Sequence, residues 1–303
     1  MTHRLPFGQV ARVLADLPRL TVSAGGISRQ LRRLGRWLDP YYERVKLALR
    51  ASPRVNGDRS GNRRLPRDET GRRTNGRNGY LWAVTDERHT LYHVDKSRSG
   101  RVVEGLLGRG FDGALTCDFY GAYNRLDCPK QRCLAHLLRE LRDTADKHPA
   151  FAAGAFRRKA VRLVKDMLAL KRRWGELSDR RYTARARRIE GRLEQLAKAE
   201  YDEPNATRLA KRMRKHRTEL TRFPWDKDLG GTNNAAERAL RPAVVARKIS
   251  GGSRSDQGAA AWARLASLMR TASQQGRDVL ETVKHLLIEH WAGKPAMALT
   301  APA

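Results

Sequence analysis

The sequence predicts an α/β fold in which helices flank a mixed sheet, with a helical segment at the N-terminus and a helical insertion inside the sheet domain. Two short runs rich in aromatic and β-branched residues, 80–84 and 90–94, are joined by a polar turn of hairpin length, which indicates two antiparallel strands. A third apolar run, 114–118, follows a helix-like segment that ends on Gly110. Apolar residues at helical spacing dominate the middle and both ends of the chain.

Residues 1–51 are expected to form the helical N-terminal segment. The stretch FGQVARVLADL, which begins at Phe7, is a short amphipathic candidate. Ser23 is placed to cap a longer helical run, which Pro40 would break or kink. Two helices joined by LTVSAGG resemble a helix-turn-helix, which would put a helix in a major groove, but a plain helical subdomain is the simpler interpretation.

Residues 52–148 are expected to hold the first part of the sheet domain. Residues 52–79 are rich in arginine and predict a loop with at most one short strand, at PRVNG. The hairpin, a helix, the strand ALTCD, a short strand and a further helix then follow in order. Three antiparallel strands followed by a crossover to another strand are the RNase H-like pattern. That pattern brings a carboxylate near the hairpin close to Asp118, which ends the later strand.

Residues 149–222 are predicted to form the helical insertion. Apolar stripes at helical spacing begin at Val161 and Ile189, each flanked by dense Lys and Arg, and the helices break around Pro204. Residues 223–303 are expected to complete the sheet domain. In this last part, GGTNNAAERALRP opens a helix, KISGGSRS is a Gly/Ser loop, and two closing helices follow.

Charge is the strongest compositional signal. Lys and Arg number 62 against 32 Asp and Glu, so the formal net charge is +30. Such an excess favours a polyanionic partner, because each phosphate that is neutralised releases condensed counterions. Nucleic acid is therefore preferred over an anionic membrane, and the basic faces of 157–173 and 208–222 are candidate DNA tracks. We expect no membrane association, since no window approaches the ~18 apolar residues of a membrane span.

The compartment follows from the cysteines and the N-terminus. Three thinly spread cysteines argue against a disulfide framework and for a reducing environment. The first twenty residues show no long apolar core followed by a small-residue cleavage site. A cytoplasmic protein associated with the nucleoid is expected.

Acidic residues in so basic a chain are candidates for metal ligands. Two Mg²⁺ ions roughly 3.5–4 Å apart can activate the nucleophile and stabilise the leaving oxygen in phosphoryl transfer, and Mg²⁺ prefers carboxylate oxygen. Asp118 is one candidate, because it ends a strand and Gly121 permits a tight exit from the sheet. An aspartate at a strand end also commonly caps a turn, and the residues alone leave both interpretations open.

Glu237 is the second candidate. It lies in TNNAAERALRP, where Asn234 as N-cap and Glu237 as the third helical residue make a reasonable capping box. The capping-box interpretation does not explain the surrounding cations. A metal ligand that faces a phosphate would be a single acid among cations, as Glu237 is here. These cations, which are candidates for DNA binding, are Arg238, Arg241, Arg247 and Lys248.

Cys133 and His136 have the spacing of half a zinc site, with Cys128 close in sequence. No second pair completes a zinc site, so a buried thiol and a hydrogen-bonded histidine are the preferred interpretation. His136 and Arg139 could instead approach the metal site from the helix that carries them.

Four blocks occur in a fixed order along the chain: DETGRRTNGRNGYLWAVTDERHTLY, LTCDFYGAY, CLAHLLRELRD and NNAAERALRPAVVARKISGGSRS. They resemble the core blocks of the insertion-sequence 66 family of bacterial transposases. HRLPFGQVARVL and YYERVKLALRASP resemble the family as well, so the likeness covers nearly the whole chain. The resemblance implies a DDE transposase with an RNase H-like core. Its metal ligands would be an aspartate of the DET block, Asp118 and Glu237, which together hold two Mg²⁺ or Mn²⁺ ions.

The position of the first aspartate depends on one departure from the family. The family's S-P-x-V-N strand runs almost directly into A-D-E-T, whereas here DRSGNRRLPR intervenes between SPRVNG and DET. The strand leads to Asp58, and the motif with its downstream hairpin leads to Asp68. We take Asp68 as the first ligand because DETG and the hairpin match continuously. Asp58 stays as the alternative, since Pro66 makes LPR a poor strand.

The resemblance also implies an activity: metal-dependent cleavage and strand transfer of an insertion sequence. The expected partners are the double-stranded transposon ends and target DNA, with a homo-oligomer assembled on DNA. Relative to the family, the chain is expected to be a form shortened at the N-terminus, without a cysteine-rich zinc module. Two alternatives are a catalytically impaired remnant that only binds DNA and an RNase H-like nuclease that cuts without joining.

Overall fold

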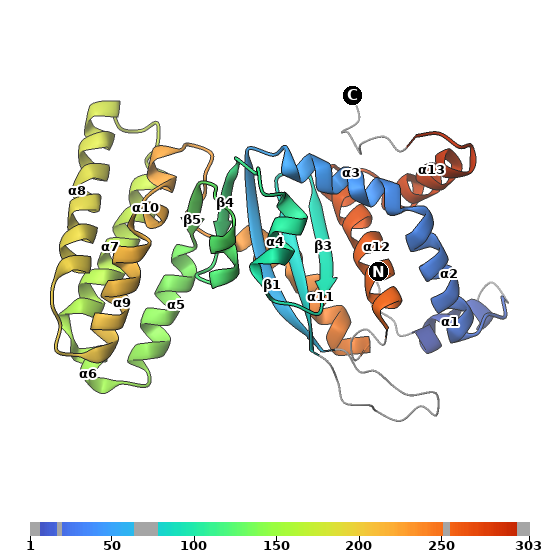
Figure 1. The fold of residues 1–303 in the computed structure, drawn as a ribbon, viewed down its shortest axis with the longest axis horizontal. Helices are drawn as coiled ribbons and strands as arrows, with labels where there is room; N and C mark the ends of the chain where they lie inside the picture. The colour runs from blue at the N-terminus through green and yellow to red at the C-terminus, as the bar shows by residue number, and fades with distance from the viewer. Residues whose placement is uncertain (1–6, 17–19, 64–77, 251–254, 296–303) are drawn as a thin grey trace. The chain divides into compact units, whose positions relative to one another are not determined.

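The computed structural model describes residues 7–16, 20–63, 78–250 and 255–295 (Figure 1). By their internal contacts the residues divide into two compact units, which are described separately below. Unit 1 comprises 1–111, 124–127 and 234–303, and unit 2 comprises 112–123 and 128–233.

The sheet of unit 1 contains three antiparallel strands: β1 (Arg54–Arg63), β2 (Asn78–Thr85) and β3 (Thr90–Asp95). Strand β2 pairs with β3 from Tyr80 opposite Asp95 to Thr85 opposite Thr90. The turn between them is closed by a backbone hydrogen bond of 3.0 Å from Asp86 to His89. The hairpin predicted from the aromatic and β-branched runs is therefore confirmed.

Strand β1 departs from the expectation for the arginine-rich stretch. The sequence predicts a loop with one short strand, but β1 continues for ten residues and pairs with β2 as far as Arg63 opposite Asn78. The prediction of a loop was wrong for this part. The backbone of β1 makes its hydrogen bonds with β2. Amino-acid composition does not indicate which strands pair, so the arginine-rich stretch looked like a loop. Residues 64–77, which include Asp68, lie outside the described residues.

Seven helices are described in unit 1. Ser23 accepts a hydrogen bond of 3.0 Å from the Gly26 amide and so caps α2, as predicted. The predicted break at Pro40 is also confirmed, because α2 ends at Trp37 and Pro40 lies in the first turn of α3. The helices are α1 (Phe7–Asp16), α2 (Ala24–Trp37), α3 (Asp39–Arg50), α4 (Gly100–Leu107), α11 (Asn234–Ser250), α12 (Asp256–Gln274) and α13 (Val279–Trp291).

Helix α12 lies along β3 (Figure 1) and bonds to its outward-facing backbone. The Tyr92 amide donates to Ser267 Oγ at 2.8 Å, and the Thr90 amide donates to Thr271 Oγ1 at 3.1 Å. The Tyr42 hydroxyl donates to the Tyr92 carbonyl at 3.0 Å. Ser267 and Thr271 are both fully buried, so these bonds satisfy backbone groups that have no access to water.

Helix α2 also packs closely on α12. A Cβ atom on Gly35 would lie only 2.9 Å from the Cα of Ala261, so these two small residues set how near the helices approach. Leu240 and Ala243 of α11 pack with Leu81 of β2 in one buried cluster, to which α12 contributes Ala263 and Ala266. Helices α11 and α12 are therefore both held against the sheet by this cluster.

The strands of unit 2 are β4 (Ala114–Cys117) and β5 (Lys130–Arg132), which pair in parallel with Leu115 opposite Lys130. Between them runs the short helix η1 (Gly121–Arg125). The Cys133 amide donates to the Cys117 carbonyl at 2.8 Å and extends the pairing. Asp118 follows directly after β4, at the strand end that the sequence predicts.

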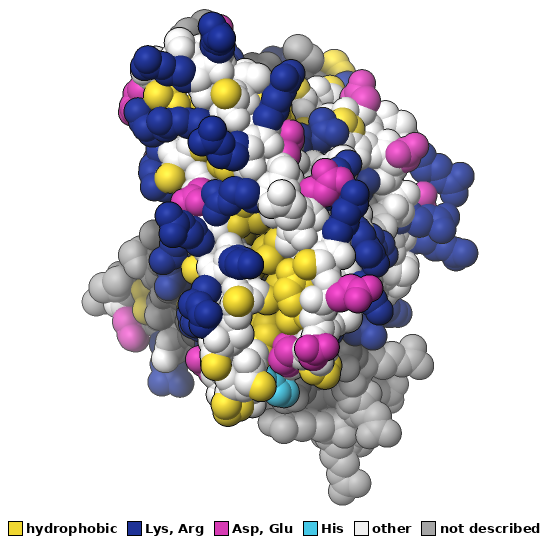
Figure 2. Space-filling view, turned by 90° about the vertical axis from the view of Figure 1, so that its left-hand side faces the viewer, with side chains coloured by type: hydrophobic (Ala, Val, Ile, Leu, Met, Phe, Trp, Pro, Cys, Tyr) yellow, Lys and Arg dark blue, Asp and Glu magenta, His cyan; other side chains and the backbone are white. Residues whose placement is uncertain are grey.

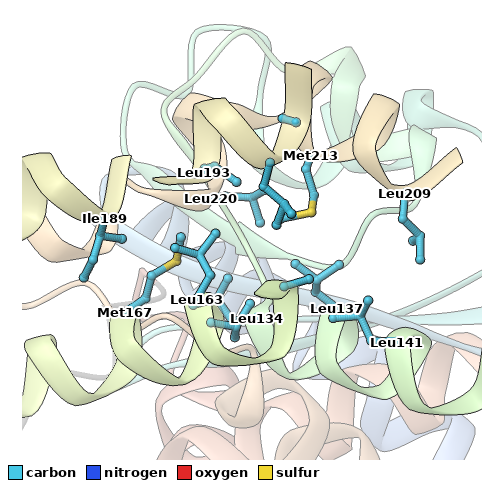
Figure 3. Close-up of a cluster of buried hydrophobic side chains, with 14 of the residues drawn as sticks. Leu134, Leu137, Leu141, Leu163, Met167, Ile189, Leu193, Leu209, Met213 and Leu220 are labelled. Atoms are coloured by element: carbon cyan, nitrogen blue, oxygen red, sulfur yellow. The ribbon is translucent and has the colours of Figure 1, made fainter. Parts of the chain in front are cut away.

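Helices make up the remainder of unit 2 and share one apolar core (Figure 3). The predicted stripes supply this core, since Val164, Ile189 and Leu193 are all buried. The helices are α5 (Leu134–Ala145), α6 (Pro149–Ala153), α7 (Ala155–Arg172), α8 (Asp179–Lys198), α9 (Pro204–Lys215), α10 (Arg217–Leu220) and η2 (Phe223–Trp225).

The predicted fold class is confirmed. The described strands form both antiparallel and parallel pairs, and helices flank them, as in RNase H-like proteins. Among the described helices, none has an apolar stretch long enough to cross a membrane.

Candidate metal and nucleic-acid sites

A cavity of about 460 Å³ in unit 1 lies between β1 and α11, and we call it the β1–α11 cavity. Two acids that are far apart in the sequence, Asp58 and Glu237, both line it. Three arginines, Arg59, Arg238 and Arg241, line it as well. Acids among guanidinium groups are suited to binding a hard cation together with a phosphate.

Asp58 lies in the middle of β1, opposite Ala83 of β2. It is only 9% exposed, and its Oδ1 accepts a hydrogen bond of 2.8 Å from the Arg59 amide. The bond to a backbone amide fixes one carboxylate oxygen relative to the strand. A buried acid is uncommon unless it has partners or a function, and the sequence alone gave no indication that Asp58 would be buried.

Glu237 is half-buried in the first turn of α11. The helix begins at Asn234, so Glu237 is its fourth residue, one position beyond that required by a capping box with Asn234 as N-cap. The Tyr92 hydroxyl donates to the Ala239 carbonyl at 2.5 Å and ties this turn to the sheet. Burial raises the pKa of Tyr92 to about 12, so the hydroxyl keeps the proton that it donates.

The predicted DNA-binding cations lie along α11. Arg238 and Arg241 are exposed beside the cavity, and Lys248 is exposed near the end of the helix. Arg247 is in the same helix, but its side chain lies outside the described ones. Pro242 has no amide proton to give to the Arg238 carbonyl, so the helix lacks one backbone bond beside the cavity.

Asp118 belongs to unit 2. Its Oδ1 accepts a hydrogen bond of 2.8 Å from the Tyr120 amide, so it does cap the turn after β4, as the simpler interpretation of the sequence expects. Its backbone oxygen accepts a bond of 2.7 Å from Arg132 Nη1. Both ends of the residue are therefore held in place.

Arg132 is a buried cation that the sequence analysis did not single out. Its side chain is fully buried, and its Nε donates to Glu219 Oε2 at 2.5 Å. The same carboxylate oxygen lies 2.7 Å from His216 Nδ1. Burial raises the pKa of Glu219, but the hydrogen bonds from His216 and Arg132 outweigh it and lower the pKa to about 2. The only local signal was an arginine within the short strand expected at QRC, and nothing near it indicates the carboxylate partner.

A second cavity, of about 570 Å³, lies within unit 2, and we call it the Asp118 cavity. Its walls come from the loop after β4, from α5 with the residues that follow it, and from α9. The lining residues are Asp118, Phe119, Tyr120, His136, Arg139, Glu140, Asp143, Thr144, Lys147, His148, Asn205 and Arg208.

The three cysteines are all free thiols. The sequence analysis expected no disulfide framework. Cys133 is fully buried, and its sulfur accepts a hydrogen bond of 3.1 Å from the Asn233 amide. The expected burial of the Cys133 thiol is thus confirmed, and its role stays a prediction. His136 lines the Asp118 cavity from α5, and its alternative role beside a metal site stays a prediction.

The basic faces predicted as DNA tracks are exposed on the helices of unit 2. Figure 2 shows Lys and Arg side chains over much of one face, around an apolar patch. The exposed cations of α7 include Arg158, Lys159, Arg162 and Lys165, and those of α9 include Lys211, Arg214 and Lys215. Exposed cations spread over a surface are suited to the sequence-independent attraction of phosphates.

A family model described as Transposase IS66 family matches residues 1–261. The chain belongs to this family of transposases. It is 28% identical over 301 residues to the uncharacterised protein y4jD of Sinorhizobium fredii (strain NBRC 101917 / NGR234), covering 90% of this chain and 57% of that protein. It is 26% identical over 257 residues to the uncharacterised protein y4qI of the same strain, covering 73% of this chain and 46% of that protein.

The transposase chain thus spans about half the length of the curated relatives that it matches. No solved structure matches it. Of the three predicted ligands in this IS66-family transposase, Asp68 lies outside the described residues, Glu237 lines the β1–α11 cavity, and Asp118 lines the cavity of unit 2. The residue that shares a cavity with Glu237 is Asp58, the alternative first ligand.

Proposed function

We propose that this transposase cleaves DNA at the ends of an insertion sequence and joins them to a target, using Asp58, Asp118 and Glu237 as its catalytic acids. The observation that supports the proposal most is the meeting of Asp58 and Glu237 in one cavity among arginines. Asp118 is included because it follows β4 directly, at the position where the family resemblance places the second acid.

The donor chemistry fits the divalent ions that the family implies. Asp58 and Glu237 offer carboxylate oxygens, which Mg²⁺ and Mn²⁺ prefer, and both line a space with room for an ion and a phosphate group. When bound, two such ions would supply the positive charge that activates the nucleophile and stabilises the leaving oxygen. Amide donation to Oδ1 of Asp58 and of Asp118 orients both carboxylates before any ligand arrives.

The proposed reaction has two steps at phosphorus. In cleavage, a water oxygen bonds to the phosphorus while the P–O3′ bond breaks, and the departing 3′ oxygen takes up a proton. In strand transfer, the freed 3′-OH bonds to a target phosphorus while a P–O3′ bond of the target breaks. Arg238 and Arg241 are placed to bind the phosphate oxygens beside Glu237. The partners are double-stranded transposon ends and target DNA, bound by a homo-oligomer.

We propose Asp58 rather than Asp68 as the first acid. Asp58 is buried in β1 and shares a cavity with Glu237, whereas Asp68 lies in the stretch between β1 and β2 that the structure does not describe. On this proposal, Asp58 takes the place of the family's first acid, and the residues inserted relative to the family begin after it, within the second half of β1. The DET block then no longer supplies the ligand.

The test is strand transfer on the DNA segments that flank the coding sequence, with Mg²⁺ or Mn²⁺. Asp58→Asn, Asp118→Asn and Glu237→Gln should each abolish cleavage, and Asp68→Asn should keep it. Loss of activity in Asp68→Asn with retention in Asp58→Asn would reverse the assignment. Cleavage without joined products would show the nuclease alternative. DNA binding with no cleavage by the unaltered chain would show the remnant.

A further inference from the structure

We propose that the Asp118 cavity is a binding site for one nucleotide of the substrate strand, with the base unstacked from its duplex. The proposal rests on the proposed function, since it places this nucleotide beside the phosphate at which Asp118 acts. It goes further by assigning a ligand to a cavity distinct from the β1–α11 cavity.

The size and walls of the cavity suit a single nucleotide. Its volume of about 570 Å³ falls within the roughly 300–1,000 Å³ of small-ligand sites. The walls come from three elements of unit 2, so the space is a hollow and not merely a basic helix face. A DNA duplex that rests on exposed cations needs no such hollow, but a base that has left the stack does.

The charged side chains that line the Asp118 cavity include cations at its edge that can bind a phosphate. Of the acids that line the cavity, Glu140 pairs with Arg208 at 2.6 Å and also with Arg212. Asp143 pairs with Arg142 at 2.9 Å. Glu140 is thus neutralised by two arginines, whereas the exposed pair of Asp143 with Arg142 contributes little.

Arg139, on the same helix, and Lys147 and His148, just after it, are exposed at the cavity. These side chains can meet the diester phosphate of a bound nucleotide. Arginine offers a fork of donors that matches two phosphate oxygens, and lysine adds a point charge. The phosphate therefore belongs on the side of the cavity formed by α5 and the residues after it.

An aromatic wall faces the base. The Phe119 ring is held between the edge of His216, with ring centroids 5.6 Å apart, and the Arg212 guanidinium, 5.4 Å from its centroid. The half-buried Tyr120 ring meets the Tyr123 ring edge-on at 6.5 Å. Aromatic side chains that stack on bases contribute about 1–3 kcal/mol per base and tolerate any sequence.

Tyr120 also links the cavity to the acid. Its amide donates to Asp118 Oδ1 at 2.8 Å, so the residue that supplies the stacking ring also orients the carboxylate. A base stacked on Tyr120 would hold its own phosphate at a fixed distance from Asp118. The cavity would thereby select which phosphate along the strand is positioned for cleavage.

The first experiment compares two arginines of α5. A duplex of the flanking DNA carries the fluorescent base 2-aminopurine at successive positions near the cleaved end, and binding is measured in Asp118→Asn without divalent metal. One position should brighten as its base leaves the stack. Arg139→Gln should abolish the brightening and weaken binding about tenfold. Arg142→Gln is the matched control, with the same charge change on the same helix outside the cavity, and should keep both.

The second experiment separates stacking from folding. Tyr120→Ala should remove the brightening, and Tyr120→Phe, which keeps the ring, should restore it. Brightening at no position, or equal effects of Arg139→Gln and Arg142→Gln, would overturn the nucleotide site even if the unaltered chain cleaves DNA. Brightening that follows the predicted pattern in a chain that never cleaves would instead contradict the proposed function alone.

Discussion

Arg132 Nη1 donates a hydrogen bond of 2.7 Å to the backbone oxygen of Asp118. The guanidinium is fully buried, and Glu219, from the far end of the helical part of unit 2, is its carboxylate partner. A buried cation needs such a partner, because an unpaired charge in the interior is very costly. The end of the helical region thus supports the strand end that presents Asp118.

Glu219→Gln should therefore destabilise unit 2. The variant keeps the shape but removes the charge opposite buried Arg132, which should lower the free energy of unfolding by about 2 kcal/mol in urea denaturation. Glu194→Gln is the control, since Glu194 also pairs with two cations but at an exposed position, and it should change little. Equal stability of the two variants would contradict the role given to Glu219.

The same carboxylate predicts a pH dependence. The pKa of Glu219 falls from an ordinary value of 4.5 to about 2 on folding, so its contribution to stability is present above pH ~4.5. That contribution should be lost progressively as the pH falls from about 5 towards 2. The difference in unfolding free energy between the unaltered chain and Glu219→Gln should shrink over this window. A constant difference would show that Glu219 has no depressed pKa in the folded state.

Ser267→Ala should destabilise unit 1. The substitution leaves the buried Tyr92 amide without its acceptor, which should cost about 1–2 kcal/mol of unfolding free energy in chemical denaturation. Ser273→Ala, on the same helix but exposed, provides the comparison and should be nearly neutral. If both serines behave alike, the bond to Tyr92 is not a source of stability.

Mg²⁺ or Mn²⁺ should raise the thermal midpoint of the chain in the absence of DNA, because an ion that binds only the folded state stabilises it. Glu237→Gln should reduce this increase. Glu281→Gln, an exposed acid in the first turn of α13, should leave it unchanged. A metal-induced increase of the same size in both variants would exclude Glu237 as a ligand.

Arg241→Gln should lower DNA affinity with a smaller dependence on salt. Removing one phosphate contact should reduce the slope of log K against log salt by about 1 in fluorescence anisotropy titrations. Arg109→Gln makes the same charge change in unit 1 at an exposed position outside the cavity, and it should keep the slope. An unchanged slope in Arg241→Gln would remove this arginine from the phosphate contacts.

The sequence predicted features that depend on nearby residues. Ser23 and Pro40 mark helix boundaries by local chemistry, and the stripes that include Ile189 and Leu193 mark a buried helix face by spacing alone. The hairpin of β2 and β3 was also apparent, because its strands and its turn are contiguous.

Features that depend on distant partners were not predicted. The length of β1 is set by its register with β2, so composition suggested a loop where a strand forms. The choice of Asp68 over Asp58, which is buried in the strand, came from the continuous match of the DET block and the hairpin to the family, and it stays a prediction. The pairing of Arg132 with Glu219 joins residues 87 positions apart, and no local pattern marks it.

The bonds from α12 to β3 have a consequence for assembly. Ser267 and Thr271 occupy the outward amides of Tyr92 and Thr90, and the Tyr42 hydroxyl occupies the Tyr92 carbonyl. A strand from another molecule would find these polar groups already engaged and would have to displace α12 to add itself to the sheet. If copies of the chain assemble on DNA as proposed, we expect them to meet through helices, loops or the DNA itself, and not by continuing the sheet past β3.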